Sequence, residues 1–167
     1  LSASPTTIDQ GQSSTLSWNS TNATACVGTG FTAGGPSGTR STGTLNTAGT
    51  QNYQVVCSGA GGSSAPAFAS VEVLAPTATI SASPARVTSG STSSISWSAS
   101  GVVSCAVTGP SGTLASGNAN ASHVFSTGSP MSVAITGQST FTITCQTNST
   151  PVTRSVTVNV VAGFREF

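Results

Sequence analysis

Apolar residues recur at every second position in several short segments of the chain. Each such segment predicts a strand with one side facing a core, because side chains alternate between the two faces of an extended backbone. The inward residues predicted in this way are Leu16 and Trp18; Tyr53, Val55 and Cys57; Val71 and Val73; Ile95 and Trp97; Phe141, Ile143 and Cys145; and Val156, Val158 and Val160. The residues between them are mostly Ser and Thr, which tolerate water on an outer face. No segment shows the period of an amphipathic helix, so the pattern predicts an all-β protein.

The sequence contains two copies of one unit. LSASP at residues 1–5 returns as ISASP at residues 80–84, and GQSSTLSW, ending at Trp18, returns as GSTSSISW, ending at Trp97. Each half then contains a cysteine, the pentapeptide GPSGT, a second cysteine in QNYQVVC or STFTITC, and an alternating strand. A period of about 80 residues predicts two whole domains, at residues 1–75 and 76–162, followed by a tail at residues 163–167. About a dozen additional residues follow GPSGT in the second half, and we expect them to form a longer hairpin or loop.

Composition narrows the class of protein. The chain has 167 residues, of which 4% are charged, and its formal net charge is +1 with no lysine. A nucleic-acid-binding protein needs clustered Lys and Arg to displace counterions from phosphates, so the composition argues against that partner. No apolar run approaches the roughly 18 residues of a membrane span. A surface with so little charge lacks self-repulsion, so we expect it to carry glycans or to associate with copies of itself.

The repeated motifs resemble those of a known class of domain. SASP, SxLSW or SxISW, the first cysteine, and YxVxC or FTITC are similar to the tandem immunoglobulin-like repeats of bacterial secreted and surface proteins. This resemblance covers nearly the whole chain. It implies two immunoglobulin-like antiparallel β-sandwiches of about seven strands each. In antibody domains the first cysteine precedes the tryptophan and the bridge joins opposite sheets, whereas here the tryptophan comes first, so we expect a bridge within one sheet.

Four cysteines allow three pairings, and the repeat predicts Cys26 with Cys57 and Cys105 with Cys145. One disulfide then closes each domain and requires an oxidising compartment, so we expect an extracellular or cell-surface location. The chain begins with Leu1 and not with methionine, from which we expect a processed or excised product. A zinc site is the alternative interpretation of the cysteines, although they lack CxxC spacing.

The residues that could support catalysis are few. We interpret His123, the only histidine, as a polar residue of the inserted segment. A serine triad would need an acid as well, but Asp9 and Glu72 belong to the other copy and Glu166 lies in the tail. The paired carboxyls of a glycosidase and the Asp cluster of a calcium site are not placed by any motif. We therefore expect no enzymatic activity, no cofactor and no metal.

The hydroxyl and amide side chains suggest sites for the attachment or the binding of glycans. Sequons of the form N-x-S/T, which accept N-linked glycans, begin at Asn19, Asn22, Asn120 and Asn148. In a chain this rich in Ser and Thr, several sequons arise from composition alone. The alternation of Thr140, Thr142 and Thr144 along one strand presents either a hydroxyl row to a polysaccharide or to ice, or an ordinary solvated face.

The chain ends in VAGFREF, which places Phe164 and Phe167 in a tail without a counterpart in the repeat. We expect this tail to dock on the first domain of the next copy, near Leu1, in the place that residues 76–79 fill within the chain. The alternative is a frayed tail, or the cut end of a longer multidomain protein.

Together these patterns predict a non-catalytic structural unit of a surface filament, stalk or adhesin. Its predicted partners are copies of itself or neighbouring domains of a longer chain. The runner-up is a carbohydrate-binding module in which loops at residues 34–39 or 114–131 grip a glycan. In that second hypothesis Tyr53 or Phe125 is exposed and stacks on a sugar ring.

Overall fold

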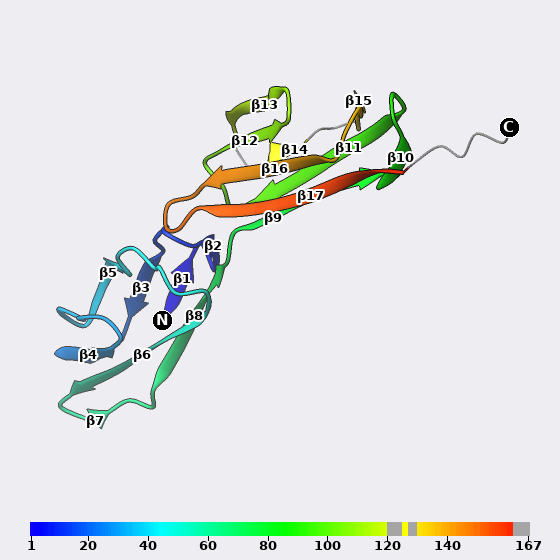
Figure 1. Ribbon diagram of the computed structural model, residues 1–167. Helices are drawn as coiled ribbons and strands as arrows, with labels where there is room; N and C mark the ends of the chain where they lie inside the picture. The colour runs from blue at the N-terminus through cyan, green and yellow to red at the C-terminus, as the bar shows by residue number, and fades with distance from the viewer. Residues whose placement is uncertain (120–124, 127–129, 162–167) are drawn as a thin grey trace, which may run out of the picture. The chain divides into compact units, whose positions relative to one another are not determined.

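The computed structural model describes residues 1–119, 125–126 and 130–161, and all regular structure within them consists of strands (Figure 1). The contacts divide the chain into two compact units, Leu1–Ala75 and Pro76–Phe167. Among the described residues there is no helix long and apolar enough to cross a membrane.

The first unit is built from two sheets. Its strands are β1 (Ser2–Ser4), β2 (Thr7–Asp9), β3 (Thr15–Asn19), β4 (Ala25–Thr29), β5 (Ser37–Ser41), β6 (Gly49–Gly59), β7 (Gly62–Ser63) and β8 (Ala67–Leu74). One sheet has the order β1-β3-β5 and the other β2-β8-β6-β4, with β7 paired to the end of β6. Pro5 lies between β1 and β2, where the chain passes from one sheet to the other, and a proline cannot donate a hydrogen bond to a sheet ladder.

The second unit repeats most of this plan, and several of its strands are longer. They are β9 (Thr77–Ser83), β10 (Arg86–Thr88), β11 (Thr92–Ser100), β12 (Ser104–Gly109), β13 (Gly112–Asn118), β14 (Phe125–Ser126), β15 (Met131–Ala134), β16 (Ser139–Gln146) and β17 (Val152–Val161). One sheet has the order β10-β17-β16-β12-β13; in the other, β9, β14 and β15 all pair with β11. The inserted residues after GPSGT therefore contribute the hairpin strand β13 and the short strands β14 and β15.

The cores follow the predicted alternation of inward side chains. All the predicted inward residues are buried except Val156 and Val160, which are half-buried. In the second unit the buried residues form one continuous cluster around Phe141, Ile95 and Trp97. In the first unit they form two clusters, and Leu1 and Phe31 pack against both.

Each disulfide joins neighbouring strands of one sheet. Cys26 on β4 lies directly opposite Cys57 on β6, and Cys105 on β12 lies opposite Cys145 on β16, with Cα–Cα distances of 3.9 Å and 4.0 Å. In each unit two sheets enclose buried apolar side chains and one disulfide joins neighbouring strands, which confirms the predicted fold class of two immunoglobulin-like β-sandwiches.

Two details differ from the sequence-based expectation. Each unit contains a parallel pair in an otherwise antiparallel arrangement, β2 with β8 and β10 with β17. The repeated GPSGT also lies in different places. In the second unit it forms the turn between β12 and β13, whereas in the first unit it leads into β5, which pairs with β3 of the opposite sheet.

The reason for this second difference is the spacing after the first cysteine. GPSGT begins nine positions after Cys26 but only four after Cys105. The additional residues of the first unit include Phe31, whose ring packs 5.4 Å from that of Trp18. Gly38 of β5 lies opposite Trp18, and a Cβ there would come within 2.8 Å of the indole. The chain crosses to the other sheet because Phe31 and Gly38 both fit against Trp18.

Candidate functional site

A hollow of about 360 Å³ lies beside Leu1 in the first unit. We call it the acceptor hollow; its lining is Leu1, residues 19–21, Val55, Cys57, residues 64–65 and Ala67. Leu1, Val55 and Ala67 make part of its wall apolar, and Asn19 and Thr21 at the end of β3 are exposed. Asn19, at the end of β3, pairs with Ser37 of β5. The hollow lies at the opposite edge of this end of β3.

The same place is filled in the second unit. The two copies align with a constant offset of 79 positions from Leu1 to Cys26, so residues 19–21 correspond to residues 98–100. There Thr77, Ala78 and Thr79 extend β9 along residues 98–100 of β11. Ala78 is only 5% exposed, and the hydroxyls of Thr77 and Ser100 are 2.8 Å apart. Because Leu1 corresponds to Ile80, the first unit has no counterpart of this stretch within residues 1–167.

Burial of the neighbouring side chains shows the effect of that stretch. Ala99 and Val102 are each 1% exposed in the second unit, whereas their counterparts Ser20 and Ala23 in the first unit are half-buried. The counterparts in the first unit are also more polar or smaller. Within residues 1–167, the side chains at the acceptor hollow are therefore less deeply buried than their counterparts in the second unit.

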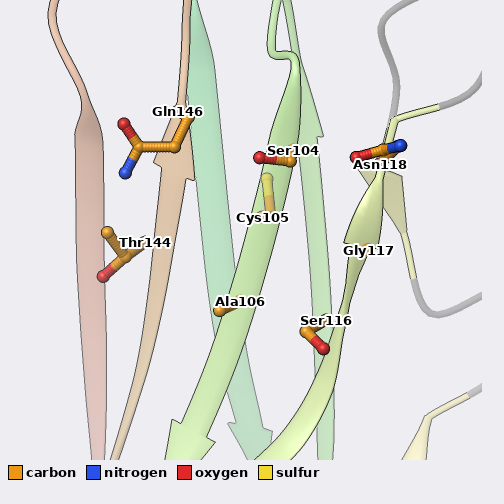
Figure 2. Close-up of a pocket in the computed structure, with 8 residues that line it drawn as sticks. All are labelled: Ser104, Cys105, Ala106, Ser116, Gly117, Asn118, Thr144 and Gln146. Atoms are coloured by element: carbon orange, nitrogen blue, oxygen red, sulfur yellow. The ribbon is translucent and has the colours of Figure 1, made fainter.

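A second hollow, of about 320 Å³, lies on the outer face of the larger sheet of the second unit. The residues around it belong to β12, β13 and β16, and Figure 2 shows Ala106 on β12. Its polar side chains are Ser104, Ser116, Asn118, Thr144 and Gln146. We call this site the amide hollow, because Asn118 and Gln146 flank it from β13 and β16.

The chemistry of the amide hollow suits a small neutral ligand with hydroxyl groups. No charged residue lines it, and none of its five polar side chains makes a hydrogen bond to the part of the chain that the structure describes. Amides and hydroxyls both donate and accept, as the hydroxyls of a sugar do. Ala106 and Gly117 leave a small floor without long side chains, and Gly117 has open space above it.

Next to the amide hollow, the hydroxyl row predicted on β16 bonds to its neighbouring strand. Thr140 lies 3.1 Å from Thr157, and Thr142 lies 2.8 Å from Ser155, measured between side-chain oxygens. These hydroxyls satisfy one another across the strands, as expected of a solvated outer face. Only Thr144, at the end of the row, belongs to the hollow.

The corresponding face of the first unit carries exposed apolar side chains. Val27 and Phe68 are 72% and 67% exposed, Val56 pairs with Val27, and Phe68 pairs with Gln54. The first unit also lacks a counterpart of β13, so β4 is the edge of its sheet. The two copies therefore present different surfaces on equivalent sheets.

The predicted core aromatics are all buried, but they differ in their polar contacts. The indole nitrogen of Trp18 donates to the carbonyl of Gly35 at 3.0 Å, whereas that of Trp97 has no partner in the described residues. Burial raises the pKa of Tyr53 above its ordinary value of 10.0, and a hydrogen bond with the Thr42 side chain opposes this. Tyr53 is 5% exposed, so the hypothesis that it stacks on a sugar is wrong.

The other predicted contact residues are placed as follows. Phe125 is half-buried and packs on the core of the second unit, so it presents no free ring to a sugar. Asn19, Asn22 and Asn148 are exposed. The predicted sites Asn120, His123, Phe164 and Phe167 lie outside the described residues.

The two loops predicted to grip a glycan are partly strands. Residues 37–41 form β5 and residues 112–118 form β13, where Leu114 packs against the core. No group of three or more His, Cys, Asp or Glu that could hold a metal occurs in residues 1–119, 125–126 and 130–161. The sequence predicted a docking place near Leu1 but not the other residues that line the acceptor hollow, and it gave no sign of the amide hollow. A difference between the two copies could have indicated the acceptor hollow. Ala99 and Val102 of the second copy correspond to Ser20 and Ala23 of the first, which are more polar or smaller.

Several solved structures are similar to this chain, and three of them are as follows. A chimeric titin Z1Z2-Z1Z2 tandem functionalised with a GRGDS peptide from fibronectin has 16% identity over 93% of this chain and 94% of its own, with a TM-score of 0.38. The Yersinia pseudotuberculosis adhesin InvE has 14% identity over 95% of this chain and 58% of its own, with a TM-score of 0.36. An amphioxus IgVJ-C2 molecule has 18% identity over 92% of this chain and 99% of its own, with a TM-score of 0.35. Neither a protein-family model nor a curated protein matches the sequence.

Proposed function

We propose that this chain is a non-catalytic structural unit of an extracellular filament, stalk or adhesin, in which copies follow one another head to tail and carry tension. The observation that supports this most directly is the parallel pair in each unit. An early strand lies beside the last strand over three residue pairs, Thr7–Asp9 with residues 72–74 and Arg86–Thr88 with residues 159–161.

The direction of these strands determines how the unit resists force. A pull on the chain before β2 and after β8 acts on two parallel neighbours in opposite directions along their axes. It therefore loads their hydrogen bonds together, in shear, and not one after another. The disulfides protect a further part of each unit, because residues between the two cysteines cannot extend while the bridge is intact. Two bridges also suit an oxidising, extracellular setting.

Electron microscopy of the native material tests the proposal. We expect regular fibres with a repeat of two domains, and their mass per length should correspond to one chain per repeat. Particles of single chains at every concentration would refute head-to-tail assembly.

The amide hollow favours a second candidate function, a module that binds a neutral saccharide. Its test is binding to immobilised neutral glycans by the full chain. Ala106→Leu, which would place a larger side chain on the floor of the hollow, should abolish binding. Thr108→Leu, on the same face of β12 but outside the hollow, should not. Equal binding by both variants would exclude this site.

A further inference from the structure

We infer that the acceptor hollow is a strand-addition site for the tail of a second copy, and that a phenyl ring of Phe164 or Phe167 fills it. This inference rests on head-to-tail association as proposed above, and it assigns the surface on which that association depends. The tail would lie beside residues 19–21. It would extend the line of β1 beyond Leu1, on the N-terminal side of that strand.

Residues 19–21 can pair with an added strand. In the second unit the equivalent residues 98–100 have β9 as their neighbour, in a fully antiparallel register. A segment added beside residues 19–21 would extend the sheet β1-β3-β5 in the same way. Strand addition of this kind draws its affinity from backbone hydrogen bonds and its specificity from pockets for alternate side chains.

The acceptor hollow has the size and the apolar lining that suit a phenyl ring. Ala78 fills the equivalent place with a single methyl group, but there it meets Ala99 and lies in a core that includes Val102. The first unit has Ser20 and Ala23 at these two positions, and the remaining space of about 360 Å³ is far larger than a methyl group. A phenyl ring against Leu1, Val55 and Ala67 would bury apolar surface that the first unit leaves open.

The C-terminal residues follow the second unit as residues 76–79 follow the first. The first unit ends in VEVLA at residues 71–75 and continues through residues 76–79 into the second. The second unit ends in VNVVA at residues 158–162 and continues as GFREF. The tail therefore holds the sequence position of the connecting stretch that fills this place within the chain. It also contains two aromatic residues, Phe164 and Phe167, whereas residues 76–79 contain none.

Photo-crosslinking with a synthetic peptide tests the inference. The peptide has the sequence of residues 160–167 with a photoreactive phenylalanine at position 164 or 167, and its target is the full chain. We expect crosslinks at residues 19–21 or 64–67. Ala65→Phe should reduce the yield at least about tenfold, because an exposed alanine on the rim is replaced by a ring that occupies the hollow itself.

Ala60→Phe is the matched control, since Ala60 is also exposed but does not line the hollow. Its crosslinking yield should equal that of the parent chain. No crosslinks, crosslinks that map elsewhere, or equal yields for Ala65→Phe and the control would overturn the inference. If the protein forms fibres but the peptide binds elsewhere, the proposed head-to-tail assembly stands and the assignment of the hollow fails. If the peptide binds in the hollow but the protein forms no fibres, only the proposed structural function is contradicted.

Discussion

Reduction of the disulfides should lengthen the unfolding steps of a single chain stretched from its two ends. With the bridges intact, the spans of 31 residues from Cys26 to Cys57 and of 40 residues from Cys105 to Cys145 cannot extend. At about 3.3–3.6 Å per residue, reductant should lengthen the step of the first unit by about 105 Å and that of the second by about 140 Å. The folded dimensions cancel in this difference, so it depends only on the two spans.

Force spectroscopy with and without reductant measures these steps. Replacement of Cys105 and Cys145 by alanine is the internal control, because it should lengthen only one of the two steps in the absence of reductant. Steps of unchanged length on reduction would mean that the thiols are free. A bridge between the units would give one combined step, and either result would refute the assignment of one locked span to each sandwich.

Three further predictions concern stability, each measured by chemical or thermal unfolding. Gly38→Ala should destabilise the first unit by about 1–3 kcal/mol, because its Cβ would come within 2.8 Å of the Trp18 ring. Gly34→Ala is the control and should change stability little, because a Cβ there has no neighbour within 4 Å. Equal effects of the two substitutions would contradict the packing of Gly38 on Trp18. Trp18→Phe should cost about 1 kcal/mol more than Trp97→Phe, because only Trp18 loses a hydrogen bond, and the reverse order would be inconsistent with that contact. The raised pKa of Tyr53 means that its neutral form stabilises the folded first unit, so this contribution is fully present below pH 10 and is lost as the pH rises through the folded pKa. Tyrosinate absorbance follows this single tyrosine, and ionisation at its ordinary pKa in the folded protein would contradict its burial.

The candidate sites were less predictable than the fold. The tail and Leu1 were singled out from the repeat, but the surface between residues 19–21 and Ala67 was not, because these residues are far apart in the sequence and meet only when the two sheets face each other. The amide hollow gave no signal at all. Its polar side chains come from three separate strands, and Ser, Thr, Asn and Gln are too common in this chain to mark a site.

The period-two alternation and the repeat were sufficient to predict strands, inward residues such as Leu16 and Phe141, and two sandwiches, because strand formation and burial follow from local sequence. Pairing between strands depends on contacts between distant residues. GPSGT forms a hairpin in one unit and crosses to the other sheet in the other, since Phe31 packs on Trp18 only in the first. The tertiary structure alone decided which strand edges and hollows remain open, because an edge is open only where no distant segment of the chain covers it.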